Sequence, residues 1–339
     1  MVIRDAGGTA GRRAGVMKPG GLLALVLPLL LAPAAQAGQA QGQGQLQGMT
    51  SLRIGVIPID ACTQIFVAHD KGFFEKRGLQ VSLTAMQGGP AIASAISGGA
   101  LEMGWSNTVS VIVAAAKGFD FQVVAPGALH LSTNPPTLLL ARADSPVHGP
   151  RDLEGQPVSA NELANITELS VRQWAKRGGA NPEAIRFVEI PFPQVEAALK
   201  ADRVKAAVTA EPFLTAAVAR GTARVLADVF SAISPRLLIG STIARKGWVA
   251  AHRDEARRFL EAIVEATAYI NAHPEERAAI LPKHTRLTAE VVLKITRSNF
   301  EPSLRRGDIQ PLVDAALEHG LIRSPVNVRD LVADTVPLE

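Results

Sequence analysis

Two segments join a short apolar strand to a polar loop and then to the start of a helix, an arrangement that holds small ligands in open α/β proteins. One spans residues 51–79, and the other is the run AAVTAEPF at residues 206–213. Helix N-termini present unpaired N–H groups at such loops. Their acidic, hydroxyl, amide and aromatic side chains are Asp60, Thr63, Gln64, Glu211 and Phe213. The chemistry predicted from these residues is the binding of a small molecule in a cleft.

Other loops that follow predicted strands supply glycines, hydroxyls, amides and one indole. These candidate ligand-binding residues are Gly88, Gly89, Trp105, Ser106, Asn107, Thr108, Asn134, Asn161 and Asn165. Helix N-termini and neutral hydrogen-bonding groups suit an oxyanion or a polar neutral group without buried Arg or Lys.

Several candidates also fit a purely structural role. Residues 106–108 form an ordinary N-cap for the helix that follows. Trp105 and Phe213 also fit packing between helix and sheet, and Asn134 also fits a turn. Glu211 fits either a ligand or hinge contact, or a first-turn acid that stabilises the next helix. Asp60 allows the same two interpretations, with turn formation favoured.

Motifs for catalysis are missing from the sequence. The seven histidines include no HExxH motif and no Cys/His cluster with metal-ligand spacing. A Walker loop, a GxGxxG motif after a strand and a GxSxG motif are also absent. We therefore expect no enzyme activity, no metal and no cofactor.

The N-terminus has the pattern of a secretory signal. The apolar run GLLALVLPLLLA at residues 21–32 follows Arg12, Arg13 and Lys18 and precedes small residues. We predict a signal peptide at residues 1–37, with Met1 and Met17 both open as the start and both the Sec and twin-arginine routes open. Export to the periplasm follows from this prediction.

The charge balance argues against a nucleic-acid partner. Residues 1–37 hold four of the 35 Lys and Arg and one of the 31 Asp and Glu, which leaves 31 basic and 30 acidic side chains. The mature chain then has a net charge near +1, so the basic pI comes largely from the signal. The single cysteine, Cys62, excludes an internal disulfide and is expected to be a buried apolar residue.

Strands and helices alternate along the chain after a Gln/Gly-rich leader at residues 38–50. Alternation favours a parallel sheet with helices on both faces. Helices are predicted at residues 65–77 and 288–298, among others, and the chain after Lys246 is mainly helical. The extended runs 137–142 and 237–244 are predicted to cross between two lobes. The predicted division is residues 51–142 for the first part of lobe 1, 143–237 for lobe 2 and 238–339 for the return to lobe 1.

The order of several segments resembles the periplasmic binding proteins of ABC importers for nitrate, sulfonates, taurine and thiamine precursors. The segments include RIGVIP, KGFFEKRGLQV, ARADSPV with RDLEGQPV, ALKADRVKAAVTAEPF and AYINAHPEE, and they extend over nearly all of the mature chain. Glu102 departs from the pattern, because the family commonly has aspartate there. The resemblance implies a two-lobed α/β fold of type II, with two crossover strands at the hinge.

The function implied is that of a periplasmic solute-binding component of an ABC importer. It would capture a small polar ligand by closure of the two lobes and deliver it to the permease and ATPase, acting as a monomer. The few cationic residues in the candidate loops make a nitrate-like anion less attractive as this ligand than a taurine-like zwitterion, a sulfonate or an amine-bearing ring. Two alternatives stay open at this point. One is an enzyme of the same fold, resembling thiamine pyrimidine synthase or a menaquinone-pathway lyase. The other is a partner that reports ligand occupancy to a sensor.

Overall fold

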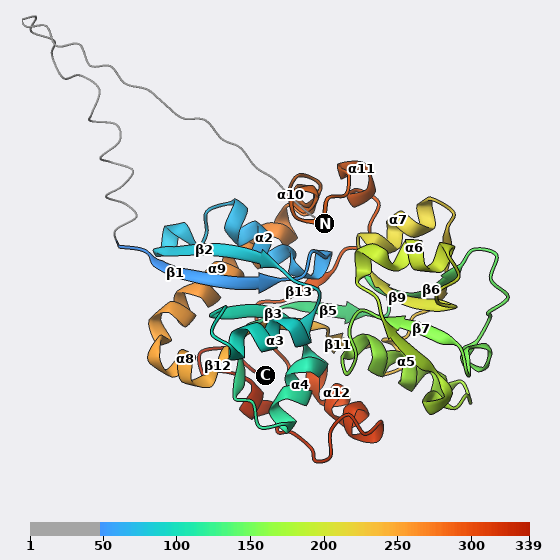
Figure 1. The fold of residues 1–339 in the computed structure, drawn as a ribbon. Helices are drawn as coiled ribbons and strands as arrows, with labels where there is room; N and C mark the ends of the chain where they lie inside the picture. The colour runs from blue at the N-terminus through green and yellow to red at the C-terminus, as the bar shows by residue number, and fades with distance from the viewer. Residues whose placement is uncertain (1–47) are drawn as a thin grey trace, which may run out of the picture. The chain divides into compact units, whose positions relative to one another are not determined.

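A computed structural model describes residues 48–339, which form one compact unit (Figure 1). The predicted signal peptide, and the predicted leader up to residue 47, lie outside the described residues. Two five-stranded sheets lie in separate lobes. The first has the order β2 (Leu79–Ala85), β1 (Thr50–Val56), β3 (Met103–Asn107), β12 (Gly240–Arg245) and β4 (Phe121–Ala125). The second has the order β10 (Ala223–Ala227), β6 (Thr137–Arg142), β9 (Ala206–Ala210), β7 (Pro157–Ala160) and β8 (Arg186–Glu189).

Both sheets are mixed, and the prediction of a parallel sheet was wrong for part of each. In the first sheet β1 pairs in parallel with β2 and β3, whereas β12 pairs antiparallel with β3 and β4. In the second, β7 is parallel to β8 and β9, whereas β6 is antiparallel to β9 and β10. The exceptions follow from connectivity, because β6 and β12 each enter a sheet directly from the other lobe instead of through a helix.

The crossing between the lobes is made by a small third sheet. It consists of β11 (Arg236–Leu238), β5 (Ala128–Leu131) and β13 (Asn299–Phe300), and β5 pairs antiparallel with both of the others. The chain crosses once through β5 and returns through β11. The run predicted to cross at residues 137–142 is β6 of the second sheet, whereas the run at 237–244 contains part of the return strand β11 together with β12. The division of the chain into lobe segments stays a prediction.

Helices cover the sheets. They are α2 (Thr63–Asp70), α3 (Gly89–Ser97), α4 (Thr108–Ala116), α5 (Ile166–Arg177), α6 (Val195–Lys200), α7 (Phe213–Ala219), α8 (Lys246–Ala251), α9 (Arg253–Ala272), α10 (Arg277–Thr285), α11 (Ala289–Val292) and α12 (Arg306–Glu318). The helices from α8 onward, orange to red in Figure 1, belong to the returning segment and confirm the mainly helical C-terminal part. Helix α12 packs against α4 and also against α5 of the second lobe.

Two helix predictions were too long. The helix expected at residues 65–77 ends at Asp70, because Gly72 adopts φ = 72° and breaks the helical path. The helix expected at residues 288–298 is only the single turn α11. The residues after it leave the helix because the backbone N–H groups of Thr296 and Ser298 donate to the carboxylates of Glu211 and Asp60.

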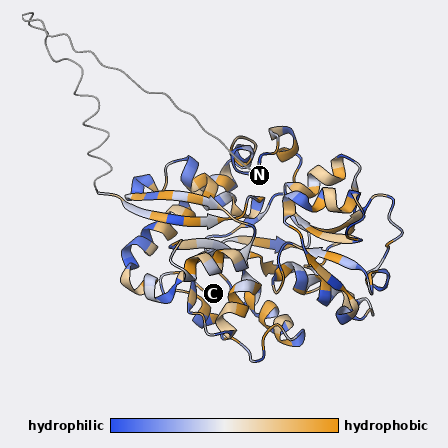
Figure 2. Cartoon of the chain, viewed as in Figure 1, coloured by the Kyte–Doolittle hydropathy of each residue, from blue (hydrophilic) through white to orange (hydrophobic). Residues whose placement is uncertain are grey.

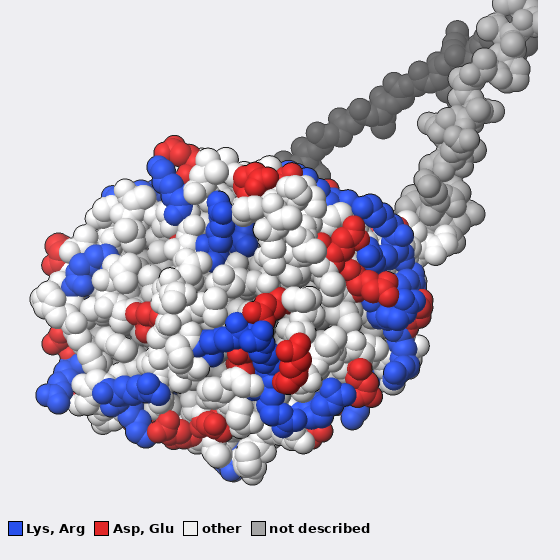
Figure 3. Space-filling model, turned by 180° about the vertical axis from the view of Figure 1, so that it is seen from behind, with Lys and Arg blue, Asp and Glu red and all other residues white. Residues whose placement is uncertain are grey.

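The apolar pattern explains how the sheets are buried. Strand β3 is buried along its whole length, as expected for a strand covered on both faces. Figure 2 shows apolar residues along the strands of both sheets, with polar residues on the outer turns of the surrounding helices. On the face drawn in Figure 3, acidic and basic side chains are interspersed, in keeping with the nearly balanced charge of the chain.

Two glycines bring the hinge passages into direct contact. A Cβ atom on Gly127 would lie 2.0 Å from the carbonyl oxygen of Gly240, and backbone atoms have little freedom to yield. We expect Gly127→Ala to lower the free energy of unfolding by about 1 to 3 kcal/mol, the usual range for overpacking. Gly247→Ala is the control, since a Cβ there meets nothing within 4 Å and replaces a helical glycine. Equal stability of the two variants in urea unfolding would contradict a rigid contact at the hinge.

Candidate functional site

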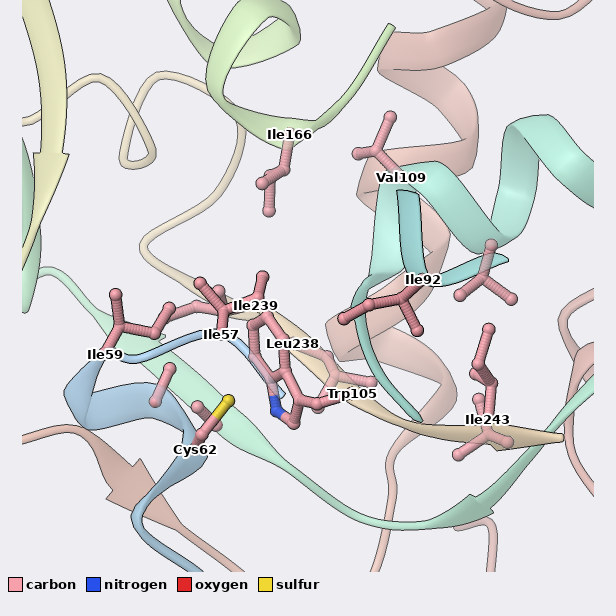
Figure 4. Packing of buried hydrophobic residues seen from close by; sticks show 14 of the residues in the cluster. Ile57, Ile59, Cys62, Ile92, Trp105, Val109, Ile166, Leu238, Ile239 and Ile243 are labelled. Atoms are coloured by element: carbon pink, nitrogen blue, oxygen red, sulfur yellow. The ribbon is translucent and has the colours of Figure 1, made fainter. Parts of the chain in front are cut away.

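A small cavity lies between the two lobes. Its volume is about 30 Å³, and both lobes contribute to its walls. The first lobe and the hinge supply Ile57, Ile59, Ala61, Trp105, Asn107 and Ile239, and the second lobe supplies Thr137, Asn161, Ile166, Thr167, Phe192, Ala210 and Phe230. In Figure 4 the indole of Trp105 lies beside Ile57 and Ile239, with Ile59 near them. Ile166 lies across from this group, at the start of the helix of the second lobe. We name this space the inner cavity.

A second pocket adjoins the inner cavity. Its volume is about 90 Å³, and it shares Ile57, Ile59 and Phe192 with the inner cavity. Its remaining walls are Pro58, Met86, Gln87, Pro191, Pro193 and Phe213. We name it the outer pocket. Because residues of both lobes line each space, opening of the lobes would expose both together.

Of the predicted site residues, four line these spaces. Trp105, Asn107 and Asn161 line the inner cavity, and Phe213 lines the outer pocket. The Trp105 indole is 3% exposed, and its Nε1 has no hydrogen-bond partner within the described part of the chain. A buried donor of this kind is costly unless something accepts its hydrogen bond.

Asparagine side chains cap the two helices that begin at the inner cavity. Asn107 Oδ1 accepts a hydrogen bond from Ser110 N at 2.9 Å in the first turn of α4. Asn165 Oδ1 does the same for Thr167 N at 2.9 Å in α5. Asn161 belongs to the same network, since its Oδ1 accepts from Asn165 Nδ2 at 2.7 Å. The amide groups therefore satisfy helix donors first, as the N-cap interpretation expects.

Gly88 and Gly89 form the start of α3 and face polar side chains at close range. A Cβ on Gly89 would lie 2.6 Å from Ser106 Oγ, and one on Gly88 would lie 2.7 Å from Asn161 Nδ2. Side chains at these positions would collide with residues that line or adjoin the inner cavity. The two glycines thus let α3 approach the second lobe.

A buried ion pair holds the loop before α2. Asp60 is fully buried, and its Oδ2 lies 2.9 Å from Nη1 of Arg277 in α10. Asp60 Oδ2 also accepts from Ser298 N at 2.6 Å, and Thr63 Oγ1 donates to Asp60 Oδ1 at 3.1 Å. Gln64 donates to Thr267 Oγ1 at 2.5 Å. These side chains are engaged within the protein, and their contact with a ligand stays a prediction.

Glu211 joins the second lobe to the returning segment. Its Oε2 accepts from Thr215 N at 3.1 Å in α7, and its Oε1 accepts from Thr296 N at 3.1 Å. The peptide bond to Pro212 is cis. Burial raises the pKa of Glu211 to about 7, and the nearby negative charge of Asp60 acts in the same direction. These contacts are those of a helix-supporting and lobe-linking acid, and a ligand contact by Glu211 is untested.

The remaining predicted residues lie apart from the two spaces. Thr108 Oγ1 donates to the carbonyl oxygen of Leu238 at 2.7 Å, which ties α4 to the hinge strand β11. Ser106 is buried beside it in β3. Asn134 is exposed, and its amide donates to the carbonyl oxygen of Arg297 at 3.0 Å.

Comparison with known proteins identifies the family. The model of the NMT1-like family matches residues 46–282, which is more than half of the chain. The chain belongs to the NMT1-like family. This confirms the resemblance drawn from the order of its sequence segments.

The names of two curated relatives of this NMT1-like chain specify sulfonate binding and nitrate import. A putative aliphatic sulfonates-binding protein from Bacillus subtilis is 23% identical over 327 residues, covering 93% of this chain and 95% of the relative. The nitrate import ATP-binding protein NrtC from Synechocystis is 27% identical over 253 residues, covering 69% of this chain. The match spans only 37% of the length of NrtC.

Solved structures confirm the fold. The periplasmic aliphatic sulphonate binding protein SsuA from Escherichia coli superposes with a TM-score of 0.68 at 21% identity, covering 85% of this chain and 94% of SsuA. The desulfurization enzyme DSZB superposes with a TM-score of 0.60 at 14% identity, covering 84% of this chain and 96% of the enzyme. The NMT1-like chain therefore has the two-lobed periplasmic-binding-protein fold, which also occurs in an enzyme.

Glu162 is a prominent residue of the interlobe contact that the sequence did not single out. It follows β7 of the second lobe, and its Oε1 accepts from Ala91 N at 3.3 Å in α3 of the first lobe. Burial raises the pKa of Glu162 to about 7, and the carboxylate of Glu189 acts in the same direction. Its place in the loop between β7 and α5 was the available signal, whereas nothing local indicates its contact with α3.

Gly240 was also missed. A Cβ there would lie 2.6 Å from Trp105 Cζ2 and 2.5 Å from the carbonyl oxygen of Ser106. The absence of a side chain lets the indole lie directly against the hinge backbone. A lone glycine in the apolar run LLIGSTIA was the signal, since such a glycine often marks a close backbone approach.

Other features of the described residues do not compete with the inner cavity. A groove of about 500 Å³ lies along α3 and α4, beside the half-exposed Phe119, and is lined mainly by one lobe. Among residues 48–339, no group of His, Cys, Asp and Glu is placed to hold a metal ion. Nor does this part of the chain contain a helix with the length and apolar character needed to cross a membrane.

Proposed function

We propose that the chain is the periplasmic solute-binding component of an ABC importer. The observation that carries this proposal is the pair of adjoining spaces between the two lobes, each lined by side chains from both. The hinge consists of just two antiparallel passages, β5 and β11, which suits a rotation that opens and closes the cleft. Its partners would be the permease and ATPase of the importer.

The contacts between the lobes fit a closed clamp. Ile166 N at the start of α5 donates to Asn107 Oδ1 at 3.3 Å, and Gln87 Nε2 donates to the carbonyl oxygen of Asn161 at 3.5 Å. Farther out, His319 Nε2 lies 2.6 Å from Gln173 Oε1. Together with the contact of Glu162 with Ala91 N, these hydrogen bonds would break when the cleft opens.

A role in binding is favoured over one in catalysis. The one thiol near the inner cavity, Cys62, is fully buried, and burial raises its pKa, which keeps it protonated and unreactive. The likeness to DSZB concerns the fold alone. We therefore propose that the chain captures and releases its ligand unchanged.

Ligand-dependent closure is the expected result that tests this function. The exported chain, purified without denaturation, should carry one small molecule in native mass spectrometry and lose it on denaturation. After refolding, adding back the released molecule should reduce the radius of gyration in small-angle scattering. A constant radius at saturating ligand, or chemical conversion of the released molecule by the chain, would contradict the proposal.

A further inference from the structure

The helix N-termini at the cleft are occupied by oxygens of the chain itself. Asn107 caps α4, Asn165 caps α5, and the carboxylate of Glu211 accepts from the first turn of α7. The fourth helix, α3, receives the carboxylate of Glu162 from the opposite lobe. In each case an N–H group of the first turn, of the kind that would bind a ligand oxyanion, is thus already paired.

Glu162 takes the position that an anionic group would occupy at α3. Its side chain is buried, with 7% exposure, and only Oε1 is hydrogen-bonded. The other oxygen, Oε2, has no partner among the described residues. A Cβ on Gly88 would lie 2.0 Å from Oε2, so only glycine at that position admits the carboxylate.

Positive charge that could offset a second anion is missing from the two spaces. No Lys or Arg side chain lines the inner cavity or the outer pocket of the described structure. The buried guanidinium of Arg277 is already paired with the carboxylate of Asp60. An anion in either space would therefore be desolvated without a countercharge.

The walls suit an apolar body instead. Trp105, Phe192 and Phe230 provide aromatic surfaces, and isoleucines complete the inner cavity. The unpaired N–H of Trp105 offers one donor in the inner cavity, and the unpaired Oε2 of Glu162 offers one acceptor beside Gly88, next to Gln87 of the outer pocket. This combination matches a molecule with one acceptor and one donor. The two spaces, about 30 and 90 Å³, would admit a ring-sized molecule of this kind when the lobes separate.

We propose that the interlobe site takes a compact organic ligand with an apolar body and no negative charge, and that Glu162 is the residue that rejects anions. This inference rests on the proposed function. It separates the chain from relatives whose names specify sulfonate or nitrate. Glu162 acts as a specificity-determining residue by occupying the α3 terminus with the chain's own carboxylate.

The test compares ligands of nearly equal shape and different charge. Calorimetric titration with benzamide, benzoate and methanesulfonate is carried out on the full exported chain and on Glu162→Gln at about pH 8.5, where Glu162, with its pKa of about 7, is ionised. Benzamide should bind the unaltered chain at least tenfold more tightly than benzoate, and methanesulfonate should not bind. In Glu162→Gln, benzoate should gain at least tenfold relative to benzamide, because like-charge repulsion is removed.

Glu189→Gln is the matched control. This variant also removes a carboxylate from the loop region, where Glu189 Oε1 accepts from Leu163 N, and it leaves the α3 contact in place. The preference for benzamide should persist in the control. Benzoate or methanesulfonate binding the unaltered chain at least as tightly as benzamide would overturn the inference and leave the binding function standing.

Two further outcomes also decide the inference. An equal preference for benzamide over benzoate in Glu162→Gln and in the unaltered chain would show that Glu162 does not reject anions. Failure of all three probes to bind would overturn the assignment of a ring-sized ligand, while native mass spectrometry of the purified chain judges the binding function independently. A thermal melt of each variant confirms that the protein is folded.

Discussion

Arg277→Met is expected to lower the free energy of unfolding by about 3 to 5 kcal/mol, the range for removing one partner of a buried ion pair. The guanidinium contacts both carboxylate oxygens of Asp60, at 3.0 and 2.9 Å, and donates to the carbonyl oxygen of Ser298 at 2.9 Å. Without it, the fully buried Asp60 carboxylate loses its countercharge. Urea unfolding measures the loss, since the shift in midpoint at constant slope gives the stability change.

Arg257→Met provides the contrast for this effect. Arg257 also contacts two carboxylates, those of Asp254 and Glu261, but its side chain is 54% exposed. Exposed pairs contribute about 0 to 1 kcal/mol. The double variant Asp60→Leu/Arg277→Met should be more stable than Arg277→Met alone, because no buried charge remains. Similar losses for Arg277→Met and Arg257→Met would show that the buried pair contributes little.

The positions of most elements could be predicted because they depend on local signals. Apolar runs separated by glycines marked β1, β2, β4 and β9 to within a few residues. The passage between lobes could not be placed in the same way. TLLLAR at residues 137–142 has the apolar composition of any buried strand, and its pairing with β9 and β10 depends on residues some 70 positions away.

The candidate site likewise contains roles that a local sequence pattern predicts and contacts that no local pattern predicts. The capping role of Asn107 follows from its place before an apolar helix, which is a local pattern. The pairing of Asp60 with Arg277 joins residues 217 positions apart, and no local pattern indicates it. The contact of Glu162 with α3 exists only when the lobes meet, so it requires the arrangement of both lobes.

The contribution of Glu162 and Glu211 to the free energy of unfolding should fall as the pH rises from about 4.5 through 7. Burial raises the folded-state pKa values of Glu162 and Glu211 to about 7, from an ordinary value of 4.5. Between these values the folded chain retains protons that the unfolded chain releases, so the folded state is favoured most at low pH. The stabilisation is complete below about pH 4.5 and is lost above about pH 7. For the deeply buried Glu211 it is on the order of 1 to 3 kcal/mol.

The measurement must isolate these carboxyl groups from groups that act in the opposite sense. Burial lowers the pKa of His130, His284 and His319, so these residues favour folding as the pH rises through the ordinary histidine range. The useful quantity is therefore the stability of Glu211→Gln minus that of the unaltered chain, measured by urea unfolding from pH 4.5 to 8. This difference should increase with pH, because only the unaltered chain loses its bound proton.

The exposed Glu290→Gln should give a difference that does not rise with pH, since Glu290 is 80% exposed and its pKa is lowered by Lys294. A flat difference for Glu211→Gln would mean that its carboxylate is ionised throughout, held by the hydrogen bonds from Thr215 and Thr296.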